Sequence, residues 1–156
     1  MEFDLKKLKE IYAPIANKHN LPSFGKLNED FEIDKIDRET DFLLRLIRKA
    51  MMEKIVNSLG FVEMLLNPVN APRLYLGYIR TISQSDKEII EKIYEILADL
   101  SLSSLSLELN SNESKEAELI SEIYKKWNEI KPDFEKIMKD MKSPRTITKK
   151  EKSYYG

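Results

Sequence analysis

Few side chains in this sequence could perform chemistry, and they are scattered along it. The single histidine, His19, has no Glu three residues before it, so the Glu-x-x-His pairs of a di-iron bundle are missing. There is no cysteine, which excludes thiol nucleophiles, thiolate zinc sites and disulfide bonds. The four glycines are far apart and form no phosphate-binding loop. We therefore predict no catalytic residue, no metal ligand and no cofactor, and we interpret His19 as a structural or surface residue.

Carboxylates are numerous, but they do not mark a catalytic pair. The chain has 27 acidic residues, so pairs such as Glu118 and Glu122 on one helical flank arise from composition alone. Catalytic carboxylates need a cleft that shifts their pKa values, and sequence spacing says nothing about a cleft. We interpret the acidic pairs as solvated helix faces.

The arginines are concentrated in one part of the chain, although the formal net charge is only −1. Residues 38–80 carry seven basic and four acidic side chains, whereas residues 81–141 carry eight basic and fourteen acidic ones. Arginine makes planar, bidentate contacts with carboxylates and phosphates. Two interpretations follow: these arginines pair with the acidic helices of the same chain, or they form a surface for an acidic partner or a nucleic-acid backbone. The candidate surface consists of Arg38, Arg45 and Arg48 on one predicted helix flank, and of Arg73 and Arg80.

Apolar residues recur at intervals of three and four along most of the chain, which predicts helices. With only four glycines and six prolines, the turns that an all-β protein requires are missing. The fold class is therefore all-α: a single helical bundle of about four long helices plus one or two short ones. Residues 1–141 form the predicted domain, and residues 142–156 form a flexible basic tail. The predicted helices cover residues 4–18, 23–30, 38–66, 71–82, 85–109 and 113–141.

Capping residues set several of these predicted boundaries. Asp4, Ser23 and Asn70 are placed to cap their helices, and Ser85-Asp86-Lys87-Glu88 has the form of a capping box. The Leu/Ser alternation of residues 100–109 fits a period of two as well as a helix. We favour a helix there, because a single strand would have no partner.

Two long helices are predicted to form the interior. Sixteen of the 25 residues from 42 to 66 are apolar, so this helix should contact neighbours on more than one side. In the helix over 113–141, apolar residues from Ile120 to Met141 alternate at three and four, and we favour packing of this seam within the chain over a dimer. Pro14 should kink or divide its helix, and Pro132 should kink its helix.

The C-terminal tail and the hydropathy pattern indicate where the protein is located and what it could bind. Residues 142–156 carry five basic side chains and one acidic one and include two tyrosines, which fits a solubilising terminus or, less well, a nucleic-acid-binding arm. No stretch of about 20 apolar residues is present, and residues 1–10 do not resemble a signal peptide. We therefore expect a cytoplasmic protein that does not insert into a membrane.

Three short runs carry a resemblance: Leu21-Pro-Ser-Phe24, Asp41-Phe-Leu-Leu-Arg45 and Leu65-Leu-Asn-Pro-Val-Asn-Ala-Pro72. Together they resemble a group of small archaeal all-helical proteins with no assigned function, over roughly residues 10–140. The resemblance implies an archaeal cytoplasm and a single helical domain. It implies no functional residue.

These observations rank three functions. The first is a non-enzymatic helical module for protein–protein interaction or scaffolding, which binds an unknown protein partner or forms a homo-oligomer. The alternative is a nucleic-acid-associated protein that uses the Arg-rich middle region and the basic tail, with binding that weakens steeply as salt rises. The third is an enzyme whose polar site lies in a cleft inside the bundle.

Overall fold

The computed structural model describes residues 4–38 and 40–143, and these residues form helices and short connections without any strand. The α-helices are α1 (Leu5–His19), α2 (Phe24–Phe31), α3 (Leu43–Leu66), α4 (Arg73–Thr81), α5 (Gln84–Leu109) and α6 (Glu113–Lys142). Two 3-10 turns, η1 (Ile33–Lys35) and η2 (Pro68–Asn70), precede α3 and α4. The predicted all-α class is confirmed. Residues 144–156, which make up most of the predicted tail, lie outside the described residues.

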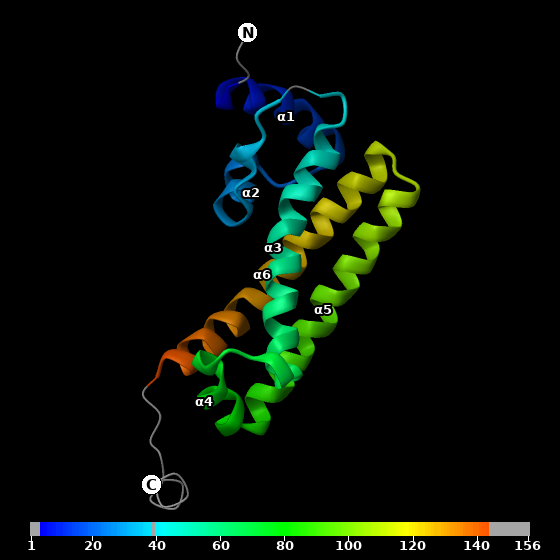
Figure 1. Ribbon diagram of the computed structural model, residues 1–156. Coiled ribbons are helices and arrows are strands. Elements are labelled where there is room, and N and C mark those ends of the chain that lie inside the picture. Colours follow the sequence, from blue (N-terminus) through cyan, green and yellow to red (C-terminus); the bar gives the residue numbers. More distant parts are fainter. Residues whose placement is uncertain (1–3, 39, 144–156) are drawn as a thin grey trace, which may run out of the picture.

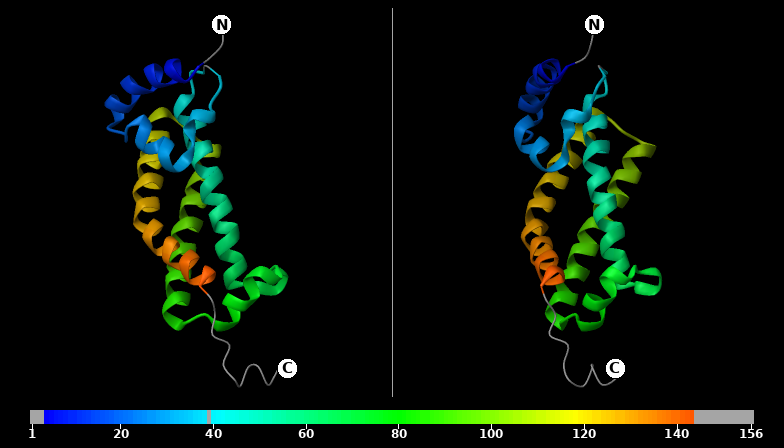
Figure 2. Two further views of the ribbon diagram at one scale, coloured as in Figure 1. Left: turned by 90° about the vertical axis from the view of Figure 1, so that its left-hand side faces the viewer. Right: turned by 60° about the vertical axis from the view of Figure 1, so that its left-hand side comes forward.

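Three long helices, α3, α5 and α6, pack side by side along most of their length (Figure 1). The other long helix, α1, lies across one end of this bundle with α2, while α4 lies at the opposite end (Figure 2). Buried side chains of α3, α5 and α6 form the centre of the core, and they include Ile47, Met51, Ile93, Leu97 and Ile123. As predicted, α3 contacts neighbours on more than one side, because it packs against both α5 and α6.

The predicted seam of α6 packs inside the chain. Ile120, Ile123, Trp127, Ile130 and Ile137 are all buried in the core. The Leu/Ser segment is helical to Leu109, as favoured from the sequence.

Neither proline interrupts its helix. Pro14 lies within the continuous helix α1, and Pro132 lies within the continuous helix α6. Both prolines are on exposed faces, where water can bind the carbonyl groups that lose their helical donor.

Three predicted helix starts are wrong. Helix α3 begins at Leu43 instead of Arg38, because the Thr40 hydroxyl accepts the Phe42 N–H at 3.1 Å and holds the chain in a turn. Helix α5 is capped by Ser83, whose hydroxyl accepts the Asp86 N–H at 3.0 Å, and not by Ser85.

Helix α4 begins after Pro72 rather than at Asn70. Residues 68–70 form the 3-10 turn η2, and Pro72 takes the cap position with no side-chain hydrogen bond. Asp4 and Ser23 cap α1 and α2 as predicted, each accepting a backbone N–H from the residue three positions later.

Tyr12 fixes the connection between α1 and α2, and it gives the chain a predicted response to alkali. Its hydroxyl donates to the Pro22 carbonyl oxygen at 2.5 Å, and burial raises its pKa to about 12. Because the folded-state pKa lies above the unfolded value of about 10, the stability linked to Tyr12 is present below pH 10 and is lost as the pH rises from 10 to 12. We expect the free energy of unfolding to fall by about 1–3 kcal/mol over this range. Urea denaturation of the wild type and of Tyr12→Phe checks this, since the variant should lack that part of the decrease.

Candidate interaction surface

The predicted arginine surface contains one residue that is not on the surface at all. Arg48 is 1% exposed and lies between α5 and α6. Its Nε and Nη2 donate to the two carboxylate oxygens of Glu116 at 2.7 and 3.0 Å, and its Nη1 donates to Ser104 and Glu108, each at 2.9 Å. The hydrogen bonds with Glu116 and then with Glu108 raise the pKa of Arg48 above its ordinary value. Four of the five N–H donors of the guanidinium are used, and burial separates it from any external partner.

Arg45 belongs to the same network, at its edge. Its Nη2 donates to Glu108 at 3.0 Å, and the Ser111 hydroxyl donates to Glu116 at 2.8 Å. Hydrogen bonds from Arg48 and then Arg45 hold the pKa of Glu108 below its usual value. For Arg45 and Arg48, the geometry is therefore that of the first interpretation, in which the arginines pair with the acidic helices of their own chain.

The three remaining arginines do not form one surface. Arg38 lies in the segment before α3, at the end of the bundle that carries α1, whereas Arg73 and Arg80 lie on α4 at the other end (Figure 1). All three are exposed, and none has an ion pair with another residue that the structure describes.

An exposed apolar stripe on α5, which the sequence reasoning missed, is the most distinctive surface of the described chain. Leu102, Leu105 and Leu109 expose 66%, 64% and 89% of their surface, although α5 is a core helix. Their spacing of three and four places them on one helical face. Leu100 and Leu107 are buried, so α5 is apolar on its core face and also on this outer face. We call Leu102, Leu105 and Leu109 the leucine stripe.

The segment of α5 that carries the leucine stripe has few charges, although the exposed Asp99 lies one turn before Leu102 on the same face. In a chain with 34% charged residues, residues 100–112 contain one, Glu108, and its carboxylate is bound by Arg45 and Arg48. The flanking polar residues of α5 are mainly small serines. Depletion of charge around exposed apolar side chains is typical of the centre of a protein–protein interface. The Leu/Ser alternation was the available sequence signal: a helix with two apolar faces mimics a period of two.

Among the described residues, no group of three or more His, Cys, Asp or Glu side chains could hold a metal ion.

His19 lies at the end of α1, where its Nε2 is 3.0 Å from Glu113 of α6. Hydrogen bonds from His19 and Lys18 lower the pKa of Glu113. The contact between His19 and Glu113 therefore links α1 to α6.

Within the described residues, no helix is long and apolar enough to span a bilayer. Comparison of the chain with protein-family models, with curated proteins and with solved structures finds no match. The resemblance to archaeal proteins stays a prediction.

Proposed function

We propose that this chain is a non-enzymatic protein-interaction module in which the leucine stripe of α5 pairs with the same stripe of a second copy. The observation that carries the proposal is the exposure of three leucines at helical spacing within a segment whose one charge is neutralised internally. A two-fold interface brings a surface against itself, so a charged patch would repel its copy, whereas an uncharged apolar stripe does not. Burying a leucine side chain stabilises an association by about 1.5–3 kcal/mol before the entropy cost.

The expected affinity is modest. Three leucines supply a few hundred Å² of apolar surface, which is less than the roughly 800 Å² per partner of a standard interface. We therefore expect a dimer that dissociates in the micromolar range.

Sedimentation equilibrium tests the proposal directly. The wild type should show a concentration-dependent dimer, and the double variant Leu102→Glu/Leu105→Glu should be monomeric, because two carboxylates per copy would be buried without partners. Leu74→Glu is the matched control: Leu74 is 82% exposed but lies on α4, so this variant should dimerise as the wild type does. A wild type that stays monomeric up to millimolar concentration would reject the homodimer.

The pairing of the most buried charged groups within the chain supports the non-enzymatic part of the proposal. Arg48 and Glu116, at 1% and 2% exposure, are bound to each other, and Asp86 is bound by Lys136 at 2.5 Å. The proposal places the protein in the cytoplasm, as its lack of cysteine favours.

Fewer exposed arginines support the nucleic-acid alternative than the sequence suggested. It retains the exposed Arg73 and Arg80 on α4 and, at the opposite end, Arg38, but it loses the buried Arg48. A phosphate backbone would have to span both ends of the bundle to contact all three. We rank it below the leucine stripe for this reason.

A further inference from the structure

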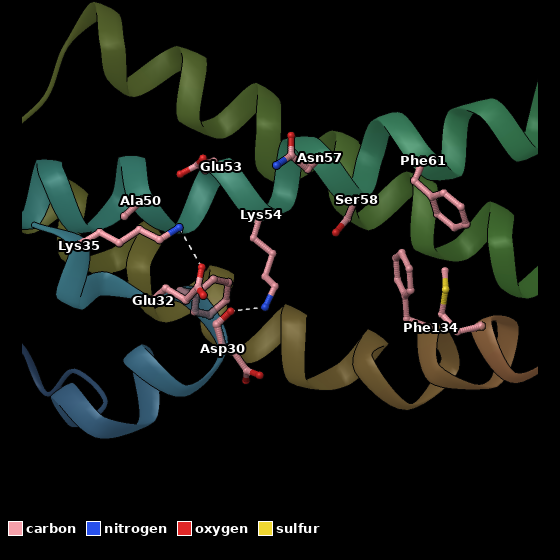
Figure 3. Close-up of a pocket in the computed structure, with 12 residues that line it drawn as sticks. Asp30, Glu32, Lys35, Ala50, Glu53, Lys54, Asn57, Ser58, Phe61 and Phe134 are labelled. Carbon is pink, nitrogen blue, oxygen red and sulfur yellow. Dashed lines mark hydrogen bonds and ion pairs between the residues drawn. The ribbon is translucent and has the colours of Figure 1, made fainter. Parts of the chain in front are cut away.

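A cleft of about 380 Å³ opens between α2, α3 and α6, on residues that the leucine stripe does not include (Figure 3). One wall is a single face of α3, because Ala50, Lys54, Asn57, Ser58 and Phe61 recur at three and four. The opposite wall comes from the end of α2 and from α6. The remaining lining residues are Asp30, Phe31, Glu32, Lys35, Glu53, Phe134 and Met138.

Lys54 is the one cation of this cleft with no carboxylate partner among the described residues. Its ammonium group donates to the backbone carbonyl of Asp30 and lies over the rings of Trp127 and Phe31, 5.4 and 6.0 Å from their centroids. These contacts fix the position of the ammonium, whose charge also lowers the pKa of Glu32, a carboxylate held mainly by Lys35. A cation that is held in place in this way favours an anionic group in the cleft.

The other charges of the cleft interact mainly with one another or with Lys131. The Asp30 carboxylate accepts from Lys131 at 2.8 Å, and Glu32 pairs with Lys35 at 2.8 Å. Glu53 also lines the cleft, and its charge helps to raise the pKa of Lys35. Lys54, which has no ion pair with a described residue, is therefore the cation of the cleft that is available to an anionic group.

One end of the cleft is apolar. Phe61 of α3 faces Phe134 of α6, with ring centroids 6.0 Å apart, and Met138 lies one turn further along α6. Phe61 follows Lys54 by seven residues, which is roughly 10 Å along a helix. Between them, the side chains of Asn57 and Ser58 have no hydrogen bond with any residue that the structure describes. The cleft thus has a cationic end, a polar middle and an apolar end.

We propose that this cleft binds a linear amphiphile of medium chain length that carries one carboxylate. The carboxylate accepts hydrogen bonds from the free donors of the Lys54 ammonium. The alkyl chain runs along α3 and ends against Phe61, Phe134 and Met138. An amphiphile with a cationic head is rejected, because its charge would lie next to Lys54.

Trp127 provides the measurement, because it is the only tryptophan in the chain and it contacts Lys54. Decanoate, titrated below its micelle concentration, should change Trp127 fluorescence saturably, and decylammonium should not. The variant Lys54→Met keeps most of the aliphatic stem but removes the charge, so it should bind decanoate at least about tenfold more weakly, as expected for the loss of a charge-assisted hydrogen bond.

Lys35→Met is the matched control. It removes a cation from the same cleft that is already paired with Glu32, and its decanoate affinity should stay within about twofold of the wild type. Far-UV circular dichroism at each ligand concentration shows that the helices stay folded. The proposal is overturned if decanoate gives no saturable change, if decylammonium binds as tightly, or if Lys54→Met binds decanoate as the wild type does.

Discussion

Arg48→Ala is expected to lower the free energy of unfolding by about 3–5 kcal/mol, a large part of the stability of a domain of this size. The reason is that the variant retains a buried carboxylate that has lost its cation. Glu116, 2% exposed, would lose two hydrogen bonds from the guanidinium and remain a buried carboxylate with only the Ser111 hydroxyl as a donor. Urea denaturation followed by far-UV circular dichroism measures the change.

Two further variants separate the buried pair from the rest of the network. Arg45→Ala removes a half-exposed partner of Glu108 and should cost less than about 1 kcal/mol. The double variant Arg48→Met/Glu116→Leu removes both buried charges, and it should regain most of the loss, because apolar residues can replace a buried ion pair at little cost. If Arg48→Ala loses no more stability than Arg45→Ala, the buried pair described here does not form in solution.

The position of Arg48 shows what local sequence patterns can and cannot predict. Its place on a helix, and pairing with acidic helices as one of two interpretations, follow from spacing and from the charge imbalance between residues 38–80 and 81–141. Its burial does not follow, because it depends on the rotation of α3 against α5 and α6. That rotation is set by the packing of the whole core, to which residues such as Ile47 and Met51 contribute.

The start of a helix is hard to predict where two neighbouring residues could both cap it. Ser83 and Ser85 can both accept a backbone N–H three residues later, and the capping-box pattern favoured Ser85. The chain uses Ser83, which places Asp86 in the first turn, buried and bound to Tyr78 and Lys136. The choice is therefore made by tertiary contacts of Asp86 rather than by the cap alone.

Neither the leucine stripe nor the cleft can be predicted from local sequence patterns, for similar reasons. The leucine stripe shares its helix with a core face, so the sequence pattern mixes two sets of leucines that point in opposite directions. The cleft joins residues near positions 30, 55 and 134, and no local pattern connects segments so far apart. The seam of α6 was predictable because its apolar residues serve one face only.

Trp127→Ala is the second change with a large expected effect, a loss of about 3–5 kcal/mol in the free energy of unfolding. Trp127 is 7% exposed, and its ring packs against Phe31 of α2 and Phe134 of α6, with centroids 6.0 and 6.2 Å away. The substitution leaves a cavity between α2, α3 and α6 and removes the aromatic face under the Lys54 ammonium. Because the fluorescence probe is lost with the indole, far-UV circular dichroism in urea measures the stability.

Trp127→Phe distinguishes the loss of packing from the loss of a polar group. The indole Nε1–H is buried and has no hydrogen-bond partner among the described residues, so replacing it by phenylalanine breaks no hydrogen bond. This variant should therefore lose only about 1–2 kcal/mol, the cost of a smaller ring. Hydrogen exchange supplies a local measurement: in Trp127→Ala, the amides of α2 should lose more protection than those of α5, because Phe31 packs on Trp127. Equal losses in the two helices, or a cost no larger than that of Trp127→Phe, would show that Trp127 does not attach α2 to the bundle.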